Sequence, residues 1–492
     1  MDPDGSPSAT SSSCRPLGAP RSRNGCQQCR KRKRKCDEHH PRCLACVDRG
    51  LPCDWGREPR QPQVARRRHH VNKDFTVPQE MRPLVTVFAA PSQPIQERLL
   101  SYFSTNSPLW LTSSGDTTAC SDVIVPIALQ NPVVYNCILA LAAGDLAKYQ
   151  PASSEMANLT YGFYGQAVAG INLALASESQ GDDVSLPNWK PDGALSQNND
   201  DLLLAILLLC VHESVNFTSI NRILPHLNAA ATLCHRRCYS GVVPDARLRG
   251  LLFEIFCYIF TLTAFSHGHH LALHLAPEIF TSPCLSDGLY KGVLLGQHCR
   301  PIFWVILRMS ILGIGISALP QPSESTAHEL LTFADQLEAY QTAWDDGDSS
   351  ISQDEAKVSE LYRLACLVHI KKTLDPWLPD WSDEIQGLVG RFIRTLNILP
   401  PTSPANNILC WPLFIAGMSS VAVSHQRLII GRLRRNYESR WRSDILSQTA
   451  DFLSKKWKRD KSLTSEGCRP ASGNPAGPVS LRPGPEFPVV LL

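Results

Sequence analysis

The sequence lacks the long apolar segment of a membrane protein and the leader of a secreted one. Its longest uninterrupted apolar run, Leu202 to Val211, is short, and the next candidate, Leu251 to Phe265, is interrupted by Glu254. Both fall short of the roughly 18–20 residues that span a bilayer. The first ten residues are polar and acidic, with no apolar signal segment. We therefore expect an intracellular protein without membrane contact, whose 18 cysteines are reduced thiols or metal ligands rather than disulfides.

The common catalytic signatures are also missing. The nucleophile motif G-x-S-x-G, the zinc-protease motif H-E-x-x-H and the phosphate-binding P-loop do not occur. The glycines of Gly313-x-Gly315-x-x-Ala318 imitate a dinucleotide-binding motif, but no βαβ pattern surrounds them and Pro320 would end the following helix at once. We therefore expect that the protein is not an enzyme.

The small net charge of +3 conceals an uneven distribution. Residues 21–70 contain 15 Lys and Arg against 5 Asp and Glu, a net charge of +10, whereas the chain from Val71 onward has a net charge of −6. A basic N-terminal module joined to a mildly acidic body indicates that one end of the chain binds a polyanion.

Composition divides the chain into five segments. Residues 1–24 are rich in Ser and Pro and are expected to be disordered, and residues 25–55 hold six closely spaced cysteines. Residues 56–93 form a linker rich in Pro and Arg, without the sustained heptad pattern of a dimerising coiled coil. Residues 94–460 have a helical pattern, and residues 461–492, rich in Gly and Pro, are expected to be a disordered tail.

The helical pattern predicts an all-α body. Asn131-Pro132 is a helix-start signal before apolar residues at helical spacing, and the run from Leu202 to Val211, apolar on all sides, predicts a buried helix. Further helices are predicted near residues 156–177, 222–238, 247–266, 301–317, 326–345, 354–374, 383–398, 407–435 and 440–457.

The N-terminal cysteines follow a regular double spacing. They are Cys26, Cys29, Cys36, Cys43, Cys46 and Cys53, so that each half consists of a C-x-x-C pair and a third cysteine seven positions later. Thiolates are soft ligands, and structural zinc takes four of them in a tetrahedron. Six thiolates complete two four-coordinate sites only when two sulfurs bridge both ions. A segment of some 30 residues has no real core, so the metal should supply most of its folding free energy.

The same six cysteines are also compatible with a disulfide knot, a chance cluster or a mononuclear zinc ribbon that uses four of them. The regular spacing, the expected reducing environment and the basic surroundings all disfavour the first two. Two ions that share all six thiolates have no open coordination position, which a catalytic zinc would need.

The segment from Gly25-Cys26-Gln27-Gln28-Cys29-Arg30 through Lys35-Cys36-Asp37-Glu38 to Pro41-Arg42-Cys43 resembles the fungal-type binuclear zinc cluster of transcription factors. The resemblance covers all six cysteines and implies two zinc ions held by two short helices. It also implies that Cys26 and Cys43 bridge the ions, that Cys29 and Cys36 complete one site, and that Cys46 and Cys53 complete the other.

All residues between Cys29 and Cys36 are basic, namely Arg30, Lys31, Arg32, Lys33, Arg34 and Lys35. A helical turn needs about 3.6 residues, so every face of this segment is cationic and suited to DNA phosphates. Arg and Lys also bind guanine O6 and N7 in the major groove. In the family the corresponding helix reads a CGG triplet, which implies Arg32 and Lys33 as base-contacting residues and Arg30 and Lys35 as phosphate-contacting or supporting residues. The run, together with Arg66 to Arg68, is also a candidate nuclear import signal.

Several stretches between about residues 95 and 460 resemble the second type of fungal-specific transcription factor domain. They include Val125 to Leu129, Leu203 to Glu213 and Cys410-Trp411-Pro412-Leu413-Phe414-Ile415-Ala416-Gly417. The resemblance implies an all-α regulatory domain. Some members of this family bind an apolar effector such as a sterol, but a lined pocket and an ordinary core look alike in sequence. The missing coiled coil leaves open a monomer on a single triplet or a homodimer through the helical body.

These observations lead to the hypothesis of a nuclear, zinc-dependent RNA polymerase II transcription factor. It would bind double-stranded DNA at CGG-type promoter sites, contact the transcription machinery and activate genes of a metabolic or secondary-metabolite pathway. The alternatives are a lipid- or sterol-responsive regulator, and a zinc-stabilised protein-interaction module that does not bind DNA.

Overall fold

In the computed structural model the chain divides into two compact units, Met1–Thr86 and Val87–Leu492. The structure describes residues 26–32, 36, 42–53, 93–113, 119–149, 154–179, 199–216, 220–238, 246–281, 292, 294–315, 322–342, 353–438 and 443–465. Residues 1–24, most of the linker, the basic residues Lys33 to Lys35 and residues 466–492 lie outside the described residues, whereas residues 461–465, expected to begin the disordered tail, are helical.

The N-terminal unit contains two short helices, α1 (Gln27–Lys31) and α2 (Leu44–Val47), which contact each other. Its interior consists of buried cysteines, with Ala45, Leu51 and Cys53 packed against them. The apolar side chains of Leu44 and Val47 on α2 are instead 58% and 48% exposed. The described part of the unit therefore has no apolar core beyond its cysteines.

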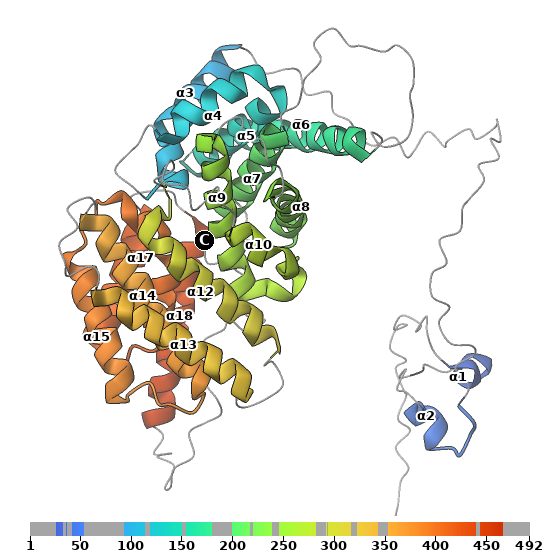
Figure 1. The fold of residues 1–492 in the computed structure, drawn as a ribbon. Helices are drawn as coiled ribbons and strands as arrows, with labels where there is room; N and C mark the ends of the chain where they lie inside the picture. The colour runs from blue at the N-terminus through green and yellow to red at the C-terminus, as the bar shows by residue number, and fades with distance from the viewer. Residues whose placement is uncertain are drawn as a thin grey trace, which may run out of the picture. The chain divides into compact units, whose positions relative to one another are not determined.

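The second unit is built from helices, and its described residues contain no β-strand, which confirms the predicted all-α body (Figure 1). Its α-helices are α3 (Gln93–Leu111), α4 (Ala119–Gln130), α5 (Pro132–Tyr149), α6 (Ser154–Ser179), α7 (Asn199–Asn216), α8 (Ile220–Cys238), α9 (Ala246–His267), α10 (Ala276–Phe280), α12 (Gly296–Gly315), α13 (Glu324–Thr342), α14 (Gln353–Leu374), α15 (Asp383–Ile398), α16 (Cys410–Met418), α17 (Val423–Asn436) and α18 (Asp444–Ser465). Short 3-10 helices are η2 (Gly268–His270), η3 (Leu273–Leu275) and η4 (Pro404–Ile408).

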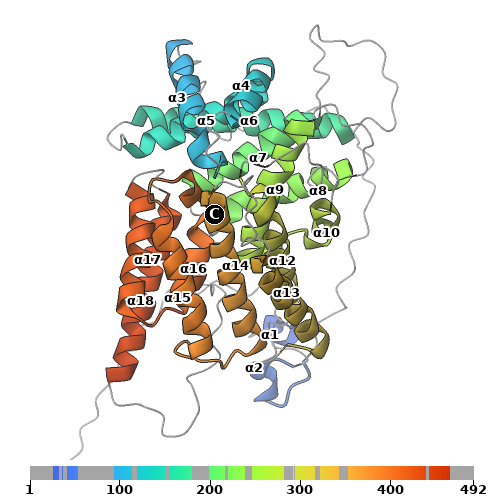
Figure 2. The ribbon, with the colours of Figure 1, turned by 60° about the vertical axis from the view of Figure 1, so that its left-hand side comes forward.

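The helices form two groups joined through α9 and α12 (Figures 1 and 2). In the first group α5 packs against α3, α4, α6 and α7, and α7 continues to α8 and α9. In the second group α14 packs against α12, α13, α15 and α16, while α16, α17 and α18 pack on one another. Helix α9 contacts α12, and α12 contacts α14, so a continuous core runs through both groups.

An aromatic cluster fixes the second group. The rings of Tyr362 on α14 and Trp411 on α16 stack with centroids 5.8 Å apart, and Phe265 of α9 meets Trp411 edge to face at 5.6 Å. Phe303 of α12 packs on Tyr362, whose hydroxyl donates a hydrogen bond to the carbonyl of Ile408. Aromatic pairs of this kind contribute about 0.5–1.5 kcal/mol each beyond the area they bury.

Helix α16 is the segment Cys410 to Gly417 that carried the resemblance, extended by one residue, and all of its side chains are buried. A Cβ added at Gly417 would lie 2.6 Å from the Cδ1 atom of Leu453, so a larger residue there would force the Leu453 side chain of α18 to move. The indole of Trp457 on α18 donates to the Gly417 carbonyl at 3.0 Å, which fixes the same contact.

Helix α9 has the length and hydropathy of a membrane-spanning helix, but its apolar window is fully buried among the other helices of the body. Glu254, which interrupts the apolar run in the sequence, does not interrupt the helix. Its carboxylate accepts a hydrogen bond from the Leu295 amide at 2.7 Å. This bond satisfies a charged side chain at a buried position, as buried polar groups require.

The prediction of one helix over residues 407–435 is wrong. The chain there forms η4, α16 and α17, with a break between Met418 and Val423. Two amide side chains stabilise the break: Gln386 of α15 donates to the Ser419 carbonyl at 2.8 Å, and Gln426 donates to the Ser420 carbonyl at 2.9 Å. Carbonyls released from a helix need such partners, and in this case tertiary contacts supply them.

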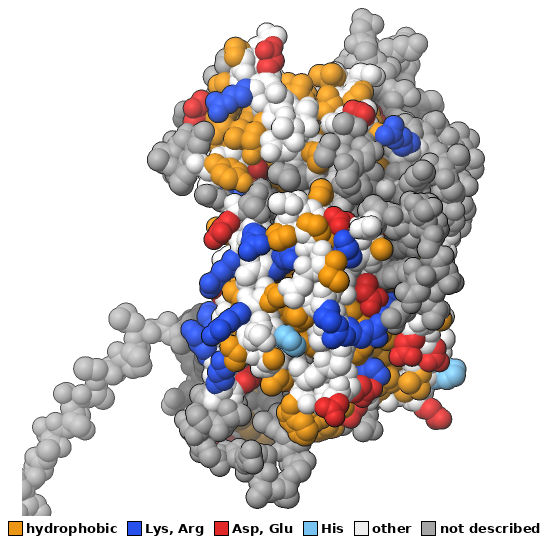
Figure 3. Space-filling model, turned by 90° about the vertical axis from the view of Figure 1, so that its left-hand side faces the viewer, with side chains coloured by type: hydrophobic (Ala, Val, Ile, Leu, Met, Phe, Trp, Pro, Cys, Tyr) orange, Lys and Arg blue, Asp and Glu red, His pale blue; other side chains and the backbone are white. Residues whose placement is uncertain are grey.

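Cationic side chains gather on the surface of the body over α17 and α18, toward one edge of the face seen in Figure 3. Helix α17 contains four arginines and no acidic residue. This local concentration contrasts with the net negative charge of the sequence from Val71 onward.

Candidate metal centre and DNA-binding module

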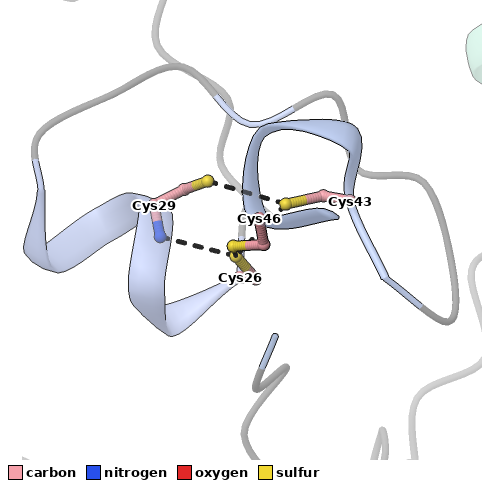
Figure 4. Close-up of side chains that lie close together, drawn as sticks. All are labelled: Cys26, Cys29, Cys43 and Cys46. Carbon is pink, nitrogen blue, oxygen red and sulfur yellow. Dashed lines mark hydrogen bonds between the residues drawn. The ribbon is translucent and has the colours of Figure 1, made fainter. Parts of the chain in front are cut away.

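The sulfur atoms of four cysteines converge in the N-terminal unit, two from each half of the sequence pattern (Figure 4). The Sγ atoms of Cys26, Cys29, Cys43 and Cys46 all lie within 4.8 Å of one another. Cys26 Sγ is 3.7 Å from both Cys43 Sγ and Cys46 Sγ, and Cys29 Sγ is 3.7 Å from Cys43 Sγ. A disulfide would need about 2.05 Å, so these are free thiols.

The measured spacing is that of a zinc–thiolate site. With Zn–S bonds of about 2.3 Å, the edge of a ligand tetrahedron is about 3.8 Å long. The three sulfur–sulfur distances of 3.7 Å agree with that edge. Within the part of the chain that the structure describes, these four cysteines are the potential ligands that lie close enough together to hold a metal ion.

The two remaining cysteines lie beside the same group. Cys36 is 3% exposed and belongs to the buried cysteine cluster, and Cys53 is half-buried against it. The backbone amide of Cys43 donates to Cys53 Sγ at 3.3 Å, and the amide of Cys29 donates to Cys26 Sγ at 3.4 Å. Amide donors of this kind stabilise thiolate charge.

Local backbone geometry brings Cys53 back to the cluster. After α2 the chain turns at Gly50, whose φ of +61° lies in the left-handed region. The Gly50 amide donates to the Val47 carbonyl at 3.1 Å, and the Leu51 amide donates to the Cys46 carbonyl at 3.0 Å. The Arg42 guanidinium donates to the Leu51 carbonyl at 3.1 Å and so also holds the segment after the turn. A left-handed residue just after a helix is a common way to end it, and glycine adopts that conformation without strain.

The thiols have strongly unequal acidities. Burial alone would raise the pKa of Cys26, but hydrogen bonds from the Cys29 amide and from neighbouring thiols lower it to about 6. Burial and hydrogen bonding to Cys26 raise the pKa of Cys29 to about 12, and burial raises the pKa of Cys43 and Cys53. These hydrogen bonds thus favour the thiolate form of Cys26, whereas burial favours the protonated form of Cys29, Cys43 and Cys53. Zinc binds thiolates and must displace the other protons, so its affinity falls as the pH falls.

The basic run begins on α1, directly beside the cysteines. Lys31, the last residue of α1, and Arg32 are exposed, and the Arg32 amide donates to the Gln28 carbonyl at 3.1 Å. Arg30 lies within α1, but its side chain, like Lys33, Arg34 and Lys35, lies outside what the structure describes. The structure therefore places two of the six expected DNA-contacting side chains on the surface next to the cysteine cluster.

Two family descriptions match the chain. Residues 24–63 match the fungal Zn(2)-Cys(6) binuclear cluster domain, and residues 98–469 match the fungal specific transcription factor domain. The second match spans most of the sequence, and the chain therefore belongs to the fungal zinc-cluster transcription factors, a class of DNA-binding regulators.

Several curated proteins share parts of the sequence. The Zn(2)-C6 fungal-type transcription factor afumD of Aspergillus fumigatus is 28% identical over 160 residues, which cover 32% of this chain and 40% of that protein. A Zn(2)-C6 fungal-type transcription factor of Gibberella zeae is 57% identical over 35 residues, 7% of each chain. The citrinin biosynthesis transcriptional activator mrl3 of Monascus ruber is 45% identical over 53 residues, 10% of each chain. The matches thus span less than half of each relative. No solved structure matches the chain.

The sequence leaves open whether the helical body has a pocket for an apolar effector, as in some members of the family. A cavity between α3, α7 and α9 has a volume of about 20 Å³ and is lined by Trp110, Leu111, Val211, Ser214, Val215, Ile255, Tyr258, Ile259 and Leu294. This volume is enough for about one water molecule, whereas ligand pockets have about 300–1,000 Å³. A lipid-sized effector would have to separate these helices in order to bind there.

Proposed function

We propose that the protein is a nuclear transcription factor whose N-terminal unit holds two zinc ions with Cys26, Cys29, Cys36, Cys43, Cys46 and Cys53 and reads CGG-type triplets in promoter DNA. The observation that carries the proposal is the convergence of four sulfurs with separations of 3.7 Å, next to the exposed cations Lys31 and Arg32. Because the described part of the module has no apolar core beyond its cysteines, we infer that the metal is needed to hold the basic segment in place.

The sulfur contacts also support the assignment of the bridging ligands. Cys26 lies 3.7 Å from Cys43 and from Cys46, while Cys43 lies 3.7 Å from Cys26 and from Cys29. Each proposed bridge thus contacts the other bridge and a terminal ligand from the opposite half of the pattern. In this arrangement Cys29 and Cys36 complete one zinc site, and Cys46 and Cys53 complete the other.

In the proposed mode of DNA binding, Arg32 and Lys33 contact guanines in the major groove, while Arg30, Lys31, Arg34 and Lys35 contact phosphates or support the segment. A good base contact contributes about 1–3 kcal/mol of discrimination, so Arg32→Gln should weaken binding to a CGG duplex by about 5- to 150-fold. Binding to scrambled DNA should change far less. Arg49→Gln is a matched control, since Arg49 is an exposed arginine of the same module outside the basic run.

The test is a gel shift of the full chain on CGG-containing and scrambled duplexes at increasing salt. A preference for CGG that Arg32→Gln removes and Arg49→Gln leaves in place would support base reading. Equal binding of both duplexes by the unsubstituted protein would contradict the CGG assignment. Failure to bind either duplex would favour a zinc-stabilised protein-interaction module.

We propose a secondary-metabolite pathway as the regulated target, with the protein acting as an activator that contacts the transcription machinery. The support is that relatives matched over 53 residues are described as activators of citrinin biosynthesis. Genome-wide occupancy of the tagged protein, combined with transcript levels in a deletion strain, tests this. Occupancy concentrated at one biosynthetic locus, with reduced transcripts there, is expected. Occupancy scattered over nutrient or lipid genes would contradict it.

We further propose that the protein is not an enzyme and that a homodimer, if one forms, assembles through the helical body. The family comprises transcription factors, which supports the first statement. The sequence between the zinc-cluster segment and the body has no heptad pattern, which supports the second. Light scattering on the full chain and on a chain truncated before residue 87 distinguishes a body-mediated dimer from a monomer.

A further inference from the structure

The helical body carries a concentrated cationic surface on two neighbouring helices. It consists of the exposed residues Arg427, Arg434 and Arg435 on α17 and Lys455, Lys458, Arg459 and Lys461 on α18, and we call it the α17–α18 face. The two helices pack against each other, and Figure 3 shows Lys and Arg side chains gathered over this edge of the body.

The charges of this face are arranged along helix surfaces. Arg427 and Arg434 are seven residues apart, so they lie on one side of α17, about 10 Å from each other along its axis. Lys455 and Lys458 are three residues apart on one side of α18. Among the described residues between 427 and 461, the exposed acids are Glu438, Asp444 and Asp451, against the seven exposed cations of the face. The face is therefore predominantly cationic.

Neighbouring basic residues serve the fold, whereas four members of the face do not. Arg432 is buried and donates to Asn406 Oδ1, the Leu396 carbonyl and the Leu399 carbonyl. Lys456 pairs with Asp460 at 2.8 Å and with Asp380 at 3.7 Å. Among the described residues, no carboxylate lies within 4 Å of the charged groups of Arg427, Arg434, Lys455 and Lys458. Their mutual repulsion is unfavourable in the free protein and would be relieved by a polyanion.

We propose that the α17–α18 face binds the phosphate backbone of DNA that flanks the site held by the zinc cluster. Duplex DNA carries one negative charge per about 1.7 Å of its axis, a density that matches an extended cationic surface. The 39 residues between Cys53 and Gln93 can span at most about 140 Å, so a body tethered to a bound zinc cluster stays within reach of flanking DNA. Tethering of this kind makes even weak contacts effective, because the local concentration of the duplex is high.

The inference rests on the proposed DNA binding and makes a separate prediction about duplex length. A short duplex of about 14 bp has room for the zinc cluster alone, and one of about 40 bp adds flanking phosphates. The full chain should bind the long duplex more tightly than the short one, and with a steeper dependence on salt. Each phosphate contact contributes a slope of about 0.9 to a plot of log K against log salt concentration.

Two charge-removal variants each replace two exposed arginines. Arg427→Gln/Arg434→Gln removes two exposed arginines from the face. Arg98→Gln/Arg236→Gln removes two exposed arginines from α3 and α8 and serves as the control. On the long duplex, the salt slope of the first variant should be smaller than that of the unsubstituted chain by up to about 1.8. Between 50 and 200 mM salt, the affinity of this variant should therefore fall by a factor about tenfold smaller than that of the unsubstituted chain. The control should behave as the unsubstituted chain does, including any effect of duplex length itself. Lys455→Gln/Lys458→Gln should repeat the effect from α18.

The measurement is fluorescence anisotropy of both duplexes, with thermal unfolding followed to show that the variants are folded. Equal affinity and equal salt slope of the face variant and the unsubstituted chain on the long duplex would overturn the proposal. Such a result, with short-duplex binding intact, would assign the face to an acidic protein partner instead. Failure of all proteins to bind the short duplex would contradict the proposed function itself, which keeps the two failures distinguishable.

Discussion

The bridging role proposed for Cys26 can be tested by comparing it with a terminal ligand. Cys26 is fully buried, with its sulfur 3.7 Å from two other sulfurs, whereas Cys53 lies at the edge of the cluster and is half-buried. In a binuclear cluster Cys26→Ser removes a thiolate from both zinc sites. Cys53→Ser removes a thiolate from one site only. The two substitutions should therefore differ in the number of ions they release.

The magnitude follows from the binding energy of structural zinc. A complete four-ligand site contributes about 10–16 kcal/mol, so one of its four thiolates accounts for about 2.5–4 kcal/mol, a loss of about 70- to 900-fold in affinity. Cys53→Ser should weaken one ion by that factor and leave the other tightly bound. Cys26→Ser should weaken both ions, and because the described part of the module has no apolar core, it should unfold.

The assay is native mass spectrometry of the full chain after dialysis against chelators of increasing strength. We expect two zinc ions in the unsubstituted chain, one in Cys53→Ser and none in Cys26→Ser. Cys137→Ser is the control: this buried cysteine of α5 donates to the Ala205 carbonyl at 3.5 Å, a bond that serine can replace, and it lies outside the cluster. One retained ion in both cluster variants would refute the bridging role, and a single ion in the unsubstituted chain would refute the binuclear assignment.

Three further predictions concern stability. Gly50→Ala should destabilise the zinc-bound module by about 1–2 kcal/mol, because φ is +61° there while no atom lies within 4 Å of an added Cβ; a chelator titration of both proteins measures this, and an unchanged midpoint would contradict it. Arg432→Met should cost the body about 3–5 kcal/mol in urea unfolding, since three buried acceptors lose their donor, whereas Arg434→Met, at an exposed position, should change stability by less than about 0.5 kcal/mol; similar values for the two would show that the Arg432 contacts contribute little. Burial lowers the pKa of His212 to about 3 in the folded body, against about 6.5 in the unfolded chain. The stability that comes from burying the neutral imidazole is therefore fully present above about pH 6.5 and is lost as the pH falls toward 3. Acidification to pH 5 should lower the free energy of unfolding of the body by about 2 kcal/mol, and His212→Leu should reduce this loss.

Local signals allowed much of the structure to be predicted from the sequence. The helix predicted over residues 383–398 has those bounds, and its start is fixed by Ser382, whose hydroxyl accepts from the Ile385 amide at 3.4 Å. Asn131 likewise accepts from the Val133 amide at 3.0 Å and begins α5. The cysteine cluster was foreseeable for a similar reason, because chelation depends on the spacing of ligands close together in the chain. Features decided within a few residues are visible in a single sequence.

Features that depend on distant residues were missed. The break after Met418 is stabilised by Gln386, a residue of α15, and periodicity within residues 407–435 carries no trace of it. Arg432 has the same residue type as its exposed neighbour Arg434, and only the carbonyls of Leu396 and Leu399 determine that it is buried. For the same reason a negative net charge of the sequence from Val71 onward gave no indication of the cationic α17–α18 face.

The two units also differ in what stabilises them, and this has a functional consequence. The body has a continuous apolar core that runs from α3 to α18, so we expect it to fold without a metal. The described part of the N-terminal unit buries little besides cysteine, so its fold depends on the metal. Loss of zinc should therefore abolish base reading while leaving the α17–α18 face intact. The basic run stays cationic without zinc, so the zinc-free chain should be compared with its zinc-free Arg427→Gln/Arg434→Gln variant: a loss of the remaining salt-sensitive, sequence-independent DNA binding in the variant would assign that binding to the face.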